Sequence, residues 1–380
     1  MVAPRRILIA GGGLGGLAAA VALRQAGMEV VVCEKGPELR EIGSGLSVWP
    51  NATRALKEMG LLEATLERSA VLEGFELRSA RGAVLSGVSF TRPGRPPALC
   101  IHRADLLAVL KEPVPPECVR VGHELESFED DGAQLRARFG NGASIEGDAL
   151  VGADGIRSRA RELILGDGEP DYRGYHAWRG IAPVCHPGRR GTGMEFWGRG
   201  RRFGIEPMAD GRTFWYATRN SLRAALGNRP AWKDEVRQAF AGWAREVTEL
   251  IEATSQDAIL KHDIEDRPVL RRFGRGRATL LGDAAHLTTP NLGQGACLAI
   301  EDAVVLAGVL KGCADVERAL REYESKRYKR ARFVVTESRR IGWMGQFEGR
   351  LTAALRDVML RAIPRVMNEW QHQRYFSVGL

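Results

Sequence analysis

Two stretches far apart in the chain combine glycines with acidic residues in patterns that suit chemistry on a bound ligand. The first is ILIAGGGLGG, in which Gly11, Gly13 and Gly16 fit the spacing G-x-G-x-x-G. The second is LLGDAAHLTTPNLGQGACLAIEDA, residues 280–303, in which Asp283 follows a short apolar run and further glycines precede an apolar helix pattern. Glycine lets a backbone approach a ligand closely, and a helix N-terminus favours negative charge. Each stretch is therefore a candidate half of a ligand site.

The early stretch predicts a dinucleotide-binding turn. An apolar run over residues 6–10 leads into the glycines, an alanine-rich helix is expected over residues 17–26, and MEVVVCE reads as a second strand. In this context the glycines allow a tight turn, approach of a pyrophosphate and close packing of helix on strand. Glu34, at the end of the second strand, is placed to accept hydrogen bonds from a ribose diol. An acid there disfavours a 2′-phosphate, which favours FAD or NAD over NADP.

The later stretches favour FAD. Asp154 and Gly155 follow a strand in LVGADGIRSRAR, and Asp283 ends another. A carboxylate at Asp283 can accept hydrogen bonds from ribityl hydroxyls, which NAD lacks. The turn over residues 293–295 opens a helix whose first N–H groups can face the electron-rich edge of a reduced flavin. His286 is interpreted as structural support for this turn rather than as a catalytic base.

Pattern along the chain predicts an α/β fold with a Rossmann-like first domain, an inserted β-rich domain and C-terminal helices. Helices are also expected over residues 51–60, 103–111 and 232–254, and from residue 302 to the end with a break near Pro364. Hairpin signals occur at Asn141-Gly142 and Asp210-Gly211. We predict the cofactor-binding domain over residues 1–71, 100–170 and 269–340, the substrate domain over residues 72–99 and 171–268, and a C-terminal helical segment over residues 341–380.

Composition narrows the class of partner. The net charge is +8, but arginines and acids alternate, as in REYESKRYKR at residues 321–330, which predicts a solvated helix face rather than nucleic-acid binding. Six cysteines and seven histidines show no metal-ligand spacing, so we expect no metal and reduced thiols. The apolar N-terminal run is broken by glycines, which argues against an export signal, and no segment is long and apolar enough for a membrane span. A cytoplasmic protein, monomeric or homodimeric, is expected.

The glycine fingerprint, the Asp154-Gly155 segment and the Gly282-Asp283 segment with P…GQG…EDA together resemble the single-component, FAD-dependent aromatic hydroxylases related to para-hydroxybenzoate, salicylate and urate hydroxylases. The resemblance runs in order over about residues 5–310. It implies an FAD-binding fold, NADH or NADPH as a transient co-substrate, and O2. It further implies hydroxylation of an electron-rich aromatic or heteroaromatic small molecule through a flavin C4a-hydroperoxide.

The resemblance also assigns roles by position. Arg103 matches an arginine near the flavin pyrophosphate, and Asp154 matches an acid linked to FAD and nicotinamide handling. On the second predicted hairpin, alternation places Arg202 on one face and Tyr216 on the return strand, at positions that urate-type enzymes use to hold substrate and flavin; these two are the catalytic candidates. The predicted cofactor-binding residues are Gly11, Gly13, Leu14, Gly15, Gly16, Glu34, Lys35, Arg103, Asp154, Gly155, Asp283, Pro290, Gly293, Gly295 and Ala296.

Some alternatives remain open on the sequence alone. Sheet packing would explain Tyr216, and a surface charge in the RGRR run would explain Arg202. A flavin-dependent halogenase or saturase could use the same scaffold, although a halogenase would need a W-x-W-x-I-P element, which HAWRGIAP at residues 176–183 does not supply. A non-catalytic flavin-binding protein is the alternative outside enzymes.

Overall fold

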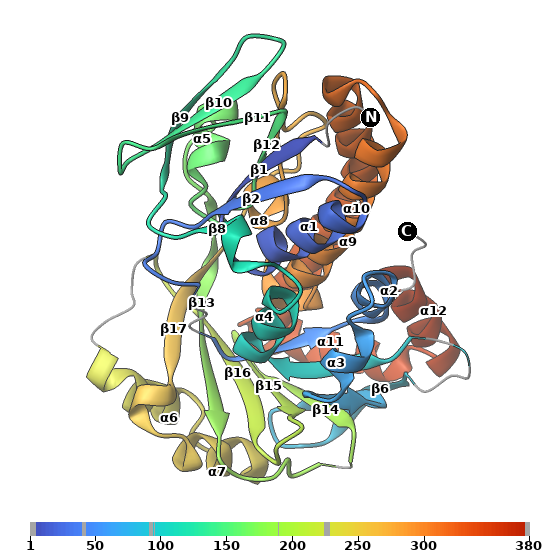
Figure 1. Ribbon diagram of the computed structural model, residues 1–380. Helices are drawn as coiled ribbons and strands as arrows, with labels where there is room; N and C mark the ends of the chain where they lie inside the picture. Colours follow the sequence, from blue (N-terminus) through green and yellow to red (C-terminus); the bar gives the residue numbers. More distant parts are fainter. Residues whose placement is uncertain are drawn as a thin grey trace.

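A five-stranded sheet forms the first layer of the computed structural model, which describes residues 5–39, 43–90, 94, 96–188, 190–223 and 229–376. Its order is β18-β12-β1-β2-β8, and every neighbouring pair is parallel. Parallel strands need crossover connections, and α1 connects β1 to β2; α9, which follows β18, packs against α1 beside this sheet (Figure 1). The elements are β1 (Arg6–Ala10), β2 (Glu29–Cys33), β8 (Val119–Arg120), β12 (Ala149–Gly152), β18 (Ala278–Leu280), α1 (Leu14–Gln25), α9 (Gly295–Gly312) and α10 (Val316–Gly345).

A seven-stranded sheet forms the second layer, below the first in Figure 1, with order β17-β13-β16-β15-β14-β5-β6. One face is covered by α6 and α7 through an aromatic core that includes Trp178, Phe203 and Trp215. Its strands are β5 (Gly74–Ser79), β6 (Val84–Ser89), β13 (Asp171–Ala182), β14 (Thr192–Trp197), β15 (Arg201–Pro207), β16 (Thr213–Asn220) and β17 (Leu260–Asp266), and the two helices are α6 (Trp232–Ala239) and α7 (Arg245–Ala253).

Two small sheets, with orders β3-β7-β4 and β11-β10-β9, and several short helices complete the described fold. The strands are β3 (Gly45–Val48), β4 (Ser69–Leu72), β7 (Ala98–His102), β9 (Leu125–Asp130), β10 (Leu135–Phe139) and β11 (Ser144–Gly147). The α-helices are α2 (Pro50–Glu58), α3 (Leu62–Leu66), α4 (Arg103–Lys111), α5 (Arg159–Leu165), α8 (Asp283–His286), α11 (Arg350–Ala362) and α12 (Arg365–Phe376). Single 3-10 turns are η1 (Pro116–Cys118), η2 (Arg229–Ala231), η3 (Gln256–Ala258) and η4 (Pro290–Leu292).

The predicted α/β fold class and both predicted hairpins are confirmed. The Asn141-Gly142 signal lies between β10 and β11, and the Asp210-Gly211 signal lies between β15 and β16. The division into domains remains a prediction, and parts of segments 1–71, 72–99, 171–268 and 341–380 lie outside the described residues. The prediction of one continuous helix from residue 302 to a break near Pro364 was wrong. Helices also end at Gly312 and at Gly345, and Asp315 caps the next helix by accepting from the Arg318 amide at 3.0 Å.

Candidate active site

A cleft opens where the carboxyl ends of the parallel strands meet the N-termini of α1 and α9. Open parallel sheets bind ligands at this edge. Twelve of the fifteen predicted cofactor-binding residues line the cleft; Gly16, Pro290 and Gly293 do not. The lining residues among those predicted are Gly11, Gly13, Leu14, Gly15, Glu34, Lys35, Arg103, Asp154, Gly155, Asp283, Gly295 and Ala296.

The first glycine turn is shaped by two close approaches. Gly11 has a φ of +108°, which side chains rarely adopt, and a Cβ there would lie 2.4 Å from the Ala153 carbonyl oxygen. A Cβ at Gly16 would lie only 1.9 Å from the Gly11 carbonyl oxygen, so helix α1 is packed directly on the turn. Gly13 is the N-cap of α1, and no side chain caps the helix. The first amides of α1 are therefore free of side-chain capping at the cleft, where an anionic pyrophosphate can accept from them.

Glu34 is hydrogen-bonded to the backbone on both sides of it, including this turn. Its carboxylate accepts from the Gly12 amide at 2.8 Å through Oε2 and from the Gly36 amide at 2.9 Å through Oε1. A carboxylate has about four acceptor positions, so each oxygen can still accept one hydroxyl of a ribose diol. The hydrogen bonds from these two backbone amides fix the direction in which the carboxylate presents its remaining acceptor positions.

Asp283 and the start of α9 lie together at the other end of the cleft. A Cβ on Gly295 would lie 3.7 Å from Asp283 Oδ1. Burial raises the pKa of Asp283, and the nearby Arg103, His286 and Arg179 act in the opposite direction. The N-cap of α9, Gln294, makes no side-chain cap, so this helix also presents uncapped amides. A ribityl chain and an anionic ring edge would meet an acceptor and donors side by side here.

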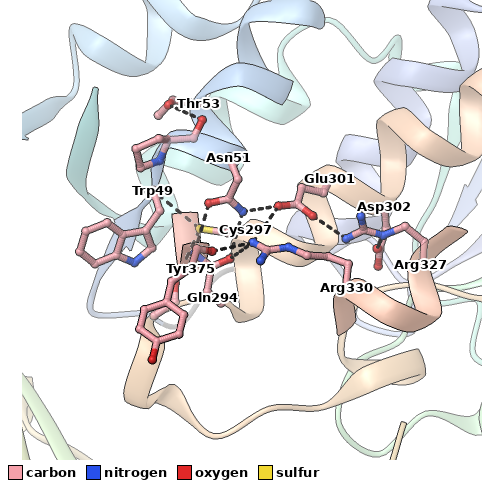
Figure 2. Close-up of polar contacts among 12 residues, drawn as sticks. Trp49, Asn51, Thr53, Gln294, Cys297, Glu301, Asp302, Arg327, Arg330 and Tyr375 are labelled. Atoms are coloured by element: carbon pink, nitrogen blue, oxygen red, sulfur yellow. Dashed lines mark hydrogen bonds and ion pairs between the residues drawn. The ribbon is translucent and has the colours of Figure 1, made fainter. Parts of the chain in front are cut away.

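A buried ionic cluster lies next to the second glycine turn, residues 293–295, and supports it (Figure 2). Asp302 Oδ2 accepts from the Gly282 amide at 3.0 Å and contacts His286 Nε2 at 2.6 Å, while Arg327 Nε donates to Oδ1 at 2.5 Å. Burial alone would raise the pKa of Asp302, but His286 and Arg327 outweigh it and lower that pKa to about 2. The cluster thus holds a charged carboxylate directly under the strand end that carries Asp283.

The same cluster corrects the interpretation of residues 321–330 as a solvated helix face. Arg327 and Arg330 are buried and pair with Glu301 on α9 at 2.7 and 3.3 Å. Arg330 also donates to the side-chain oxygen of Gln294 at 3.1 Å, next to the glycine turn (Figure 2). Charged residues are rarely buried unless paired, and here the partners come from a helix distant in sequence.

The face of the seven-stranded sheet that α6 and α7 do not cover carries the two predicted catalytic residues. The register pairs Gly204 with Tyr216, and a Cβ on Gly204 would lie 2.1 Å from the Tyr216 ring, so the ring lies across the glycine. Arg202 is buried rather than a surface charge, with 2% of its side chain exposed. It donates to Glu195 at 3.3 Å and to the Asn291 side-chain oxygen. Arg202 therefore joins this sheet to the turn that contains Pro290 and Gly293.

Two buried carboxyls lie on this face with Arg202 and Tyr216. Burial raises the pKa values of Glu195 and Glu206, although Arg202 opposes the shift at Glu195 and a hydrogen bond from Ser47 opposes it at Glu206. Ser47 Oγ donates to Glu206 at 2.8 Å. Burial, together with both carboxyls, raises the pKa of Tyr216 well above its usual value, which keeps the phenol protonated. The face therefore offers a cation, a neutral phenol and two carboxyls that resist ionisation.

Sequence reasoning missed several of these residues. Arg179 pairs with Tyr216 in the register of β13 and β16, and burial beside Arg103 lowers its pKa to about 10. Asn291, at the centre of the second turn, also donates to Tyr175 at 3.0 Å. Its position between Pro290 and Gly293 was the available signal. Glu195 was missed because the sequence reasoning did not predict the hairpin of β14 and β15, which brings it beside Arg202, seven residues further along the chain.

The hydrogen-bonding groups of the cleft fit a flavin dinucleotide. The cleft provides ribose acceptors at Glu34, uncapped amides at two helix starts, and a second acceptor at Asp283. The buried indole nitrogen of Trp49 has no hydrogen-bond partner among the described residues and lies 2.7 Å from the Cβ position of Gly293. The Asp154 carboxylate, by contrast, accepts from Ser158 Oγ at 2.5 Å and the Ala160 amide at 3.0 Å, so it caps α5 at the edge of the cleft.

Comparison with known proteins agrees with this geometry. The sequence profile of a family described as "FAD binding domain" matches residues 5–338. The chain is 39% identical to aurachin C monooxygenase/isomerase of Stigmatella aurantiaca over 358 residues, covering 93% of each chain. It is 34% identical to the FAD-dependent urate hydroxylase of Klebsiella oxytoca, covering 88% of this chain and 89% of the relative. The crystal structure of Klebsiella pneumoniae HpxO with FAD and uric acid matches with a TM-score of 0.91 at 31% identity, covering 98% and 97% of the two chains.

Proposed function

Because the chain belongs to the FAD-binding-domain family of single-component flavoprotein monooxygenases and is an FAD-dependent monooxygenase, we propose that it uses NADH or NADPH and O2 to hydroxylate an electron-rich aromatic or heteroaromatic small molecule. The reaction would take place between the second glycine turn and the face of the seven-stranded sheet. Bound FAD supplies hydride acceptance and oxygen activation, which side chains cannot provide. The protein's own residues supply orientation, charge and exclusion of water.

The observation that carries the proposal is the contact of Arg202 with Asn291, which joins the polar sheet face to the predicted flavin turn. A substrate held against this face would lie beside the start of α9. The buried guanidinium favours the anionic form of a phenol or enol by charge, and that form is the more electron-rich one. The Tyr216 hydroxyl, which stays protonated and is hydrogen-bonded to Glu195, would turn its one hydrogen to a substrate oxygen.

The two buried carboxyls favour one class of substrate within this range. A carboxylated aromatic would place an anion beside Glu195 and Glu206, whereas a ring N–H can donate a hydrogen bond to either carboxyl whether or not it is ionised. A heteroaromatic ring with ring N–H and carbonyl groups suits such a wall better than a benzoate. Uric acid, the ligand of the HpxO crystal structure, has these groups. We therefore propose a fused N-heteroaromatic substrate.

Flavin reduction tests the proposal. The FAD-loaded protein is mixed anaerobically with NADH or with NADPH, in the presence of a hydroxylated benzoate, a purine or a quinolone. We expect one nucleotide to bleach the flavin, with acceleration by a purine or a quinolone and little by the benzoate. Absence of bleaching with both nucleotides and all three ligand classes would contradict the use of NAD(P)H. Acceleration by the benzoate alone would contradict the substrate class.

The remaining assignments are also proposals. The seventeen predicted site residues keep their proposed roles, with Arg202 and Tyr216 acting on substrate and the other fifteen on FAD. We propose that the enzyme works in the cytoplasm as a monomer or homodimer without nucleic acid. A halogenase or saturase is not favoured, because the relatives reported above are a monooxygenase and a hydroxylase.

A further inference from the structure

Helix α11 is amphipathic, but its buried side carries an arginine and its exposed side is apolar. Its inward side buries Arg356, which donates to the Gly198 carbonyl at 3.1 Å, pairs with Asp357 at 2.8 Å and lies 5.2 Å from the Trp197 ring centre. Its outward side exposes four large apolar residues: Leu351 at 86%, Leu355 at 62%, Val358 at 59% and Met359 at 61%. The arginine in the middle of the helix thus faces protein, and the large apolar residues face solvent. Such a face is a contact surface for something else.

Neighbouring helices extend this apolar character. Of the thirteen exposed large hydrophobic residues in the described part of the chain, seven lie between residues 343 and 370. Arg356 also contacts the Gly345 carbonyl at 3.4 Å, so α11 lies against the end of α10, and both α11 and α12 pack on β6. We call this set the C-terminal apolar surface: Trp343, Leu351, Leu355, Val358, Met359, Met367 and Trp370.

The C-terminal apolar surface lies next to the candidate active site. Trp343 sits between two glycines of α10 that contact site residues. A Cβ on Gly342 would lie 2.4 Å from the Asn291 side chain, and one on Gly345 would lie 2.6 Å from Arg202 Cδ. The helix end that exposes Trp343 therefore also forms the inner wall beside Arg202.

Charge distinguishes between possible occupants of this surface. Exposed arginines, Arg350 and Arg361, stand at the two ends of α11, and neither forms an ion pair with a described residue. The one acid within α11, Asp357, is engaged by Arg356. A second copy packed with α11 antiparallel across a two-fold axis would bring Arg350 against the partner's Arg361, which is repulsive. Negatively charged lipid headgroups would instead complement both arginines.

We propose that the C-terminal apolar surface docks on an anionic lipid bilayer, with α11 lying in the headgroup region. No helix in the described part of the chain is long and apolar enough to cross a membrane, so the contact is with one leaflet only. Interfacial helices combine an apolar side with Trp or Leu and flanking cations, as α11 does together with Trp343 and Trp370. Docking would place the end of α10, which lies beside Arg202, next to the lipid surface. The docking proposal does not depend on the proposed activity.

Vesicle binding tests docking with the full-length, FAD-loaded protein. Co-sedimentation at low salt compares vesicles of phosphatidylcholine alone with vesicles of equal parts phosphatidylcholine and phosphatidylglycerol. We expect binding to the mixed vesicles, and about a tenfold weaker partition for the double variant Leu351→Gln/Leu355→Gln, since the apolar area entering the interface is reduced. Arg350→Gln/Arg361→Gln should weaken binding and flatten its salt dependence.

Leu222→Gln is the matched control, because Leu222 is 83% exposed and lies outside the C-terminal apolar surface. It should bind mixed vesicles as the unmodified protein does. Flavin absorbance and thermal melting establish that each variant is folded. No binding of the folded protein to mixed vesicles would overturn the proposal, as would equal binding by the Leu351/Leu355 variant. A dimer in sedimentation velocity that this variant abolishes would also overturn it, by showing that a second copy covers the surface.

Discussion

Arg202 of β15 donates a hydrogen bond to the side-chain oxygen of Asn291, which lies 89 residues further along the chain, in the turn that precedes α9. This contact ties the sheet that carries the proposed substrate face to the turn that we propose holds the flavin ring. Among the described residues, Glu195 at 3.3 Å is the only other side chain to which Arg202 donates a hydrogen bond, and the rings of Tyr175 and Trp197 lie about 6 Å from the guanidinium. The position of the guanidinium therefore depends on Asn291.

Replacing Asn291 should impair turnover more than cofactor binding. In Asn291→Ala the buried guanidinium loses a charge-assisted hydrogen bond worth about 1.5–3 kcal/mol, so we expect kcat to fall about tenfold or more. Steady-state kinetics and a flavin titration measure the two effects. Asn141→Ala, at the tip of an exposed hairpin, should change neither. If Arg202→Gln and Asn291→Ala lower kcat additively in a double-mutant cycle, the two residues do not act as a unit.

Removing the hydroxyl of Tyr216 tests its proposed contact with substrate. Tyr216→Phe keeps the ring that lies across Gly204 and removes only the protonated oxygen. Loss of one hydrogen bond to substrate should raise KM or lower kcat by about tenfold. The free energy of unfolding and the affinity for FAD should stay close to those of the unmodified enzyme. Unchanged kinetics with the preferred substrate would leave Tyr216 with a packing role only.

Glu34 should control FAD affinity. In Glu34→Gln one acceptor becomes a donor, so the side chain can no longer accept from the Gly12 amide, the Gly36 amide and a ribose diol together. We expect the dissociation constant for FAD to rise about tenfold, as measured by quenching of flavin fluorescence on titration of the apoprotein. Glu29→Gln, at the opposite end of β2, is the matched control and should bind FAD normally. Equal affinities for the two variants would count against the ribose assignment.

The buried Asp302 should make stability depend on pH at the acid end. Its pKa is lowered from 3.8 to about 2 in the folded protein, so its contribution is present above pH 4 and is lost as the pH falls towards 2. The stability difference between the unmodified protein and Asp302→Asn should shrink by about 2 kcal/mol as the pH falls from about 5 to the acid limit.

Urea unfolding at pH 6, 4 and 3 measures this difference. Asp257→Asn, an exposed acid outside the cluster, should show no comparable trend. A difference that grows as the pH falls would mean that His286 and Arg327 do not hold Asp302 in its charged form.

The sequence was most informative where function depends on local spacing. The turn from Gly11 to Gly16, the acid at Glu34 and the pairing of Asp283 with the start of α9 are each set by residues within about thirty positions of one another. A glycine at a positive φ or under a carbonyl can be inferred from such spacing, because no other residue fits. The face of β15 and β16 was also predictable, since alternation in a strand has a fixed period.

Burial of charge was not predictable in the same way. Arg202 lies in an RGRR run and Arg327 in REYESKRYKR, and both runs are typical of solvated surfaces. Asn291, Glu301 and Asp302 become their neighbours only when strands and helices distant in sequence pack together, and Glu195 faces Arg202 only once β14 and β15 pair. Burial of a charge depends on such partners, which a local pattern does not contain.

Labelled oxygen tests the proposed function most directly. The FAD-loaded enzyme turns over with its preferred nicotinamide nucleotide and a purine or quinolone that accelerates flavin reduction, under ¹⁸O2 in unlabelled water. We predict that mass spectrometry will detect one ¹⁸O atom in each product molecule. Oxidation of the nucleotide that yields only hydrogen peroxide, or a product whose new oxygen comes from water, would contradict hydroxylation by this enzyme.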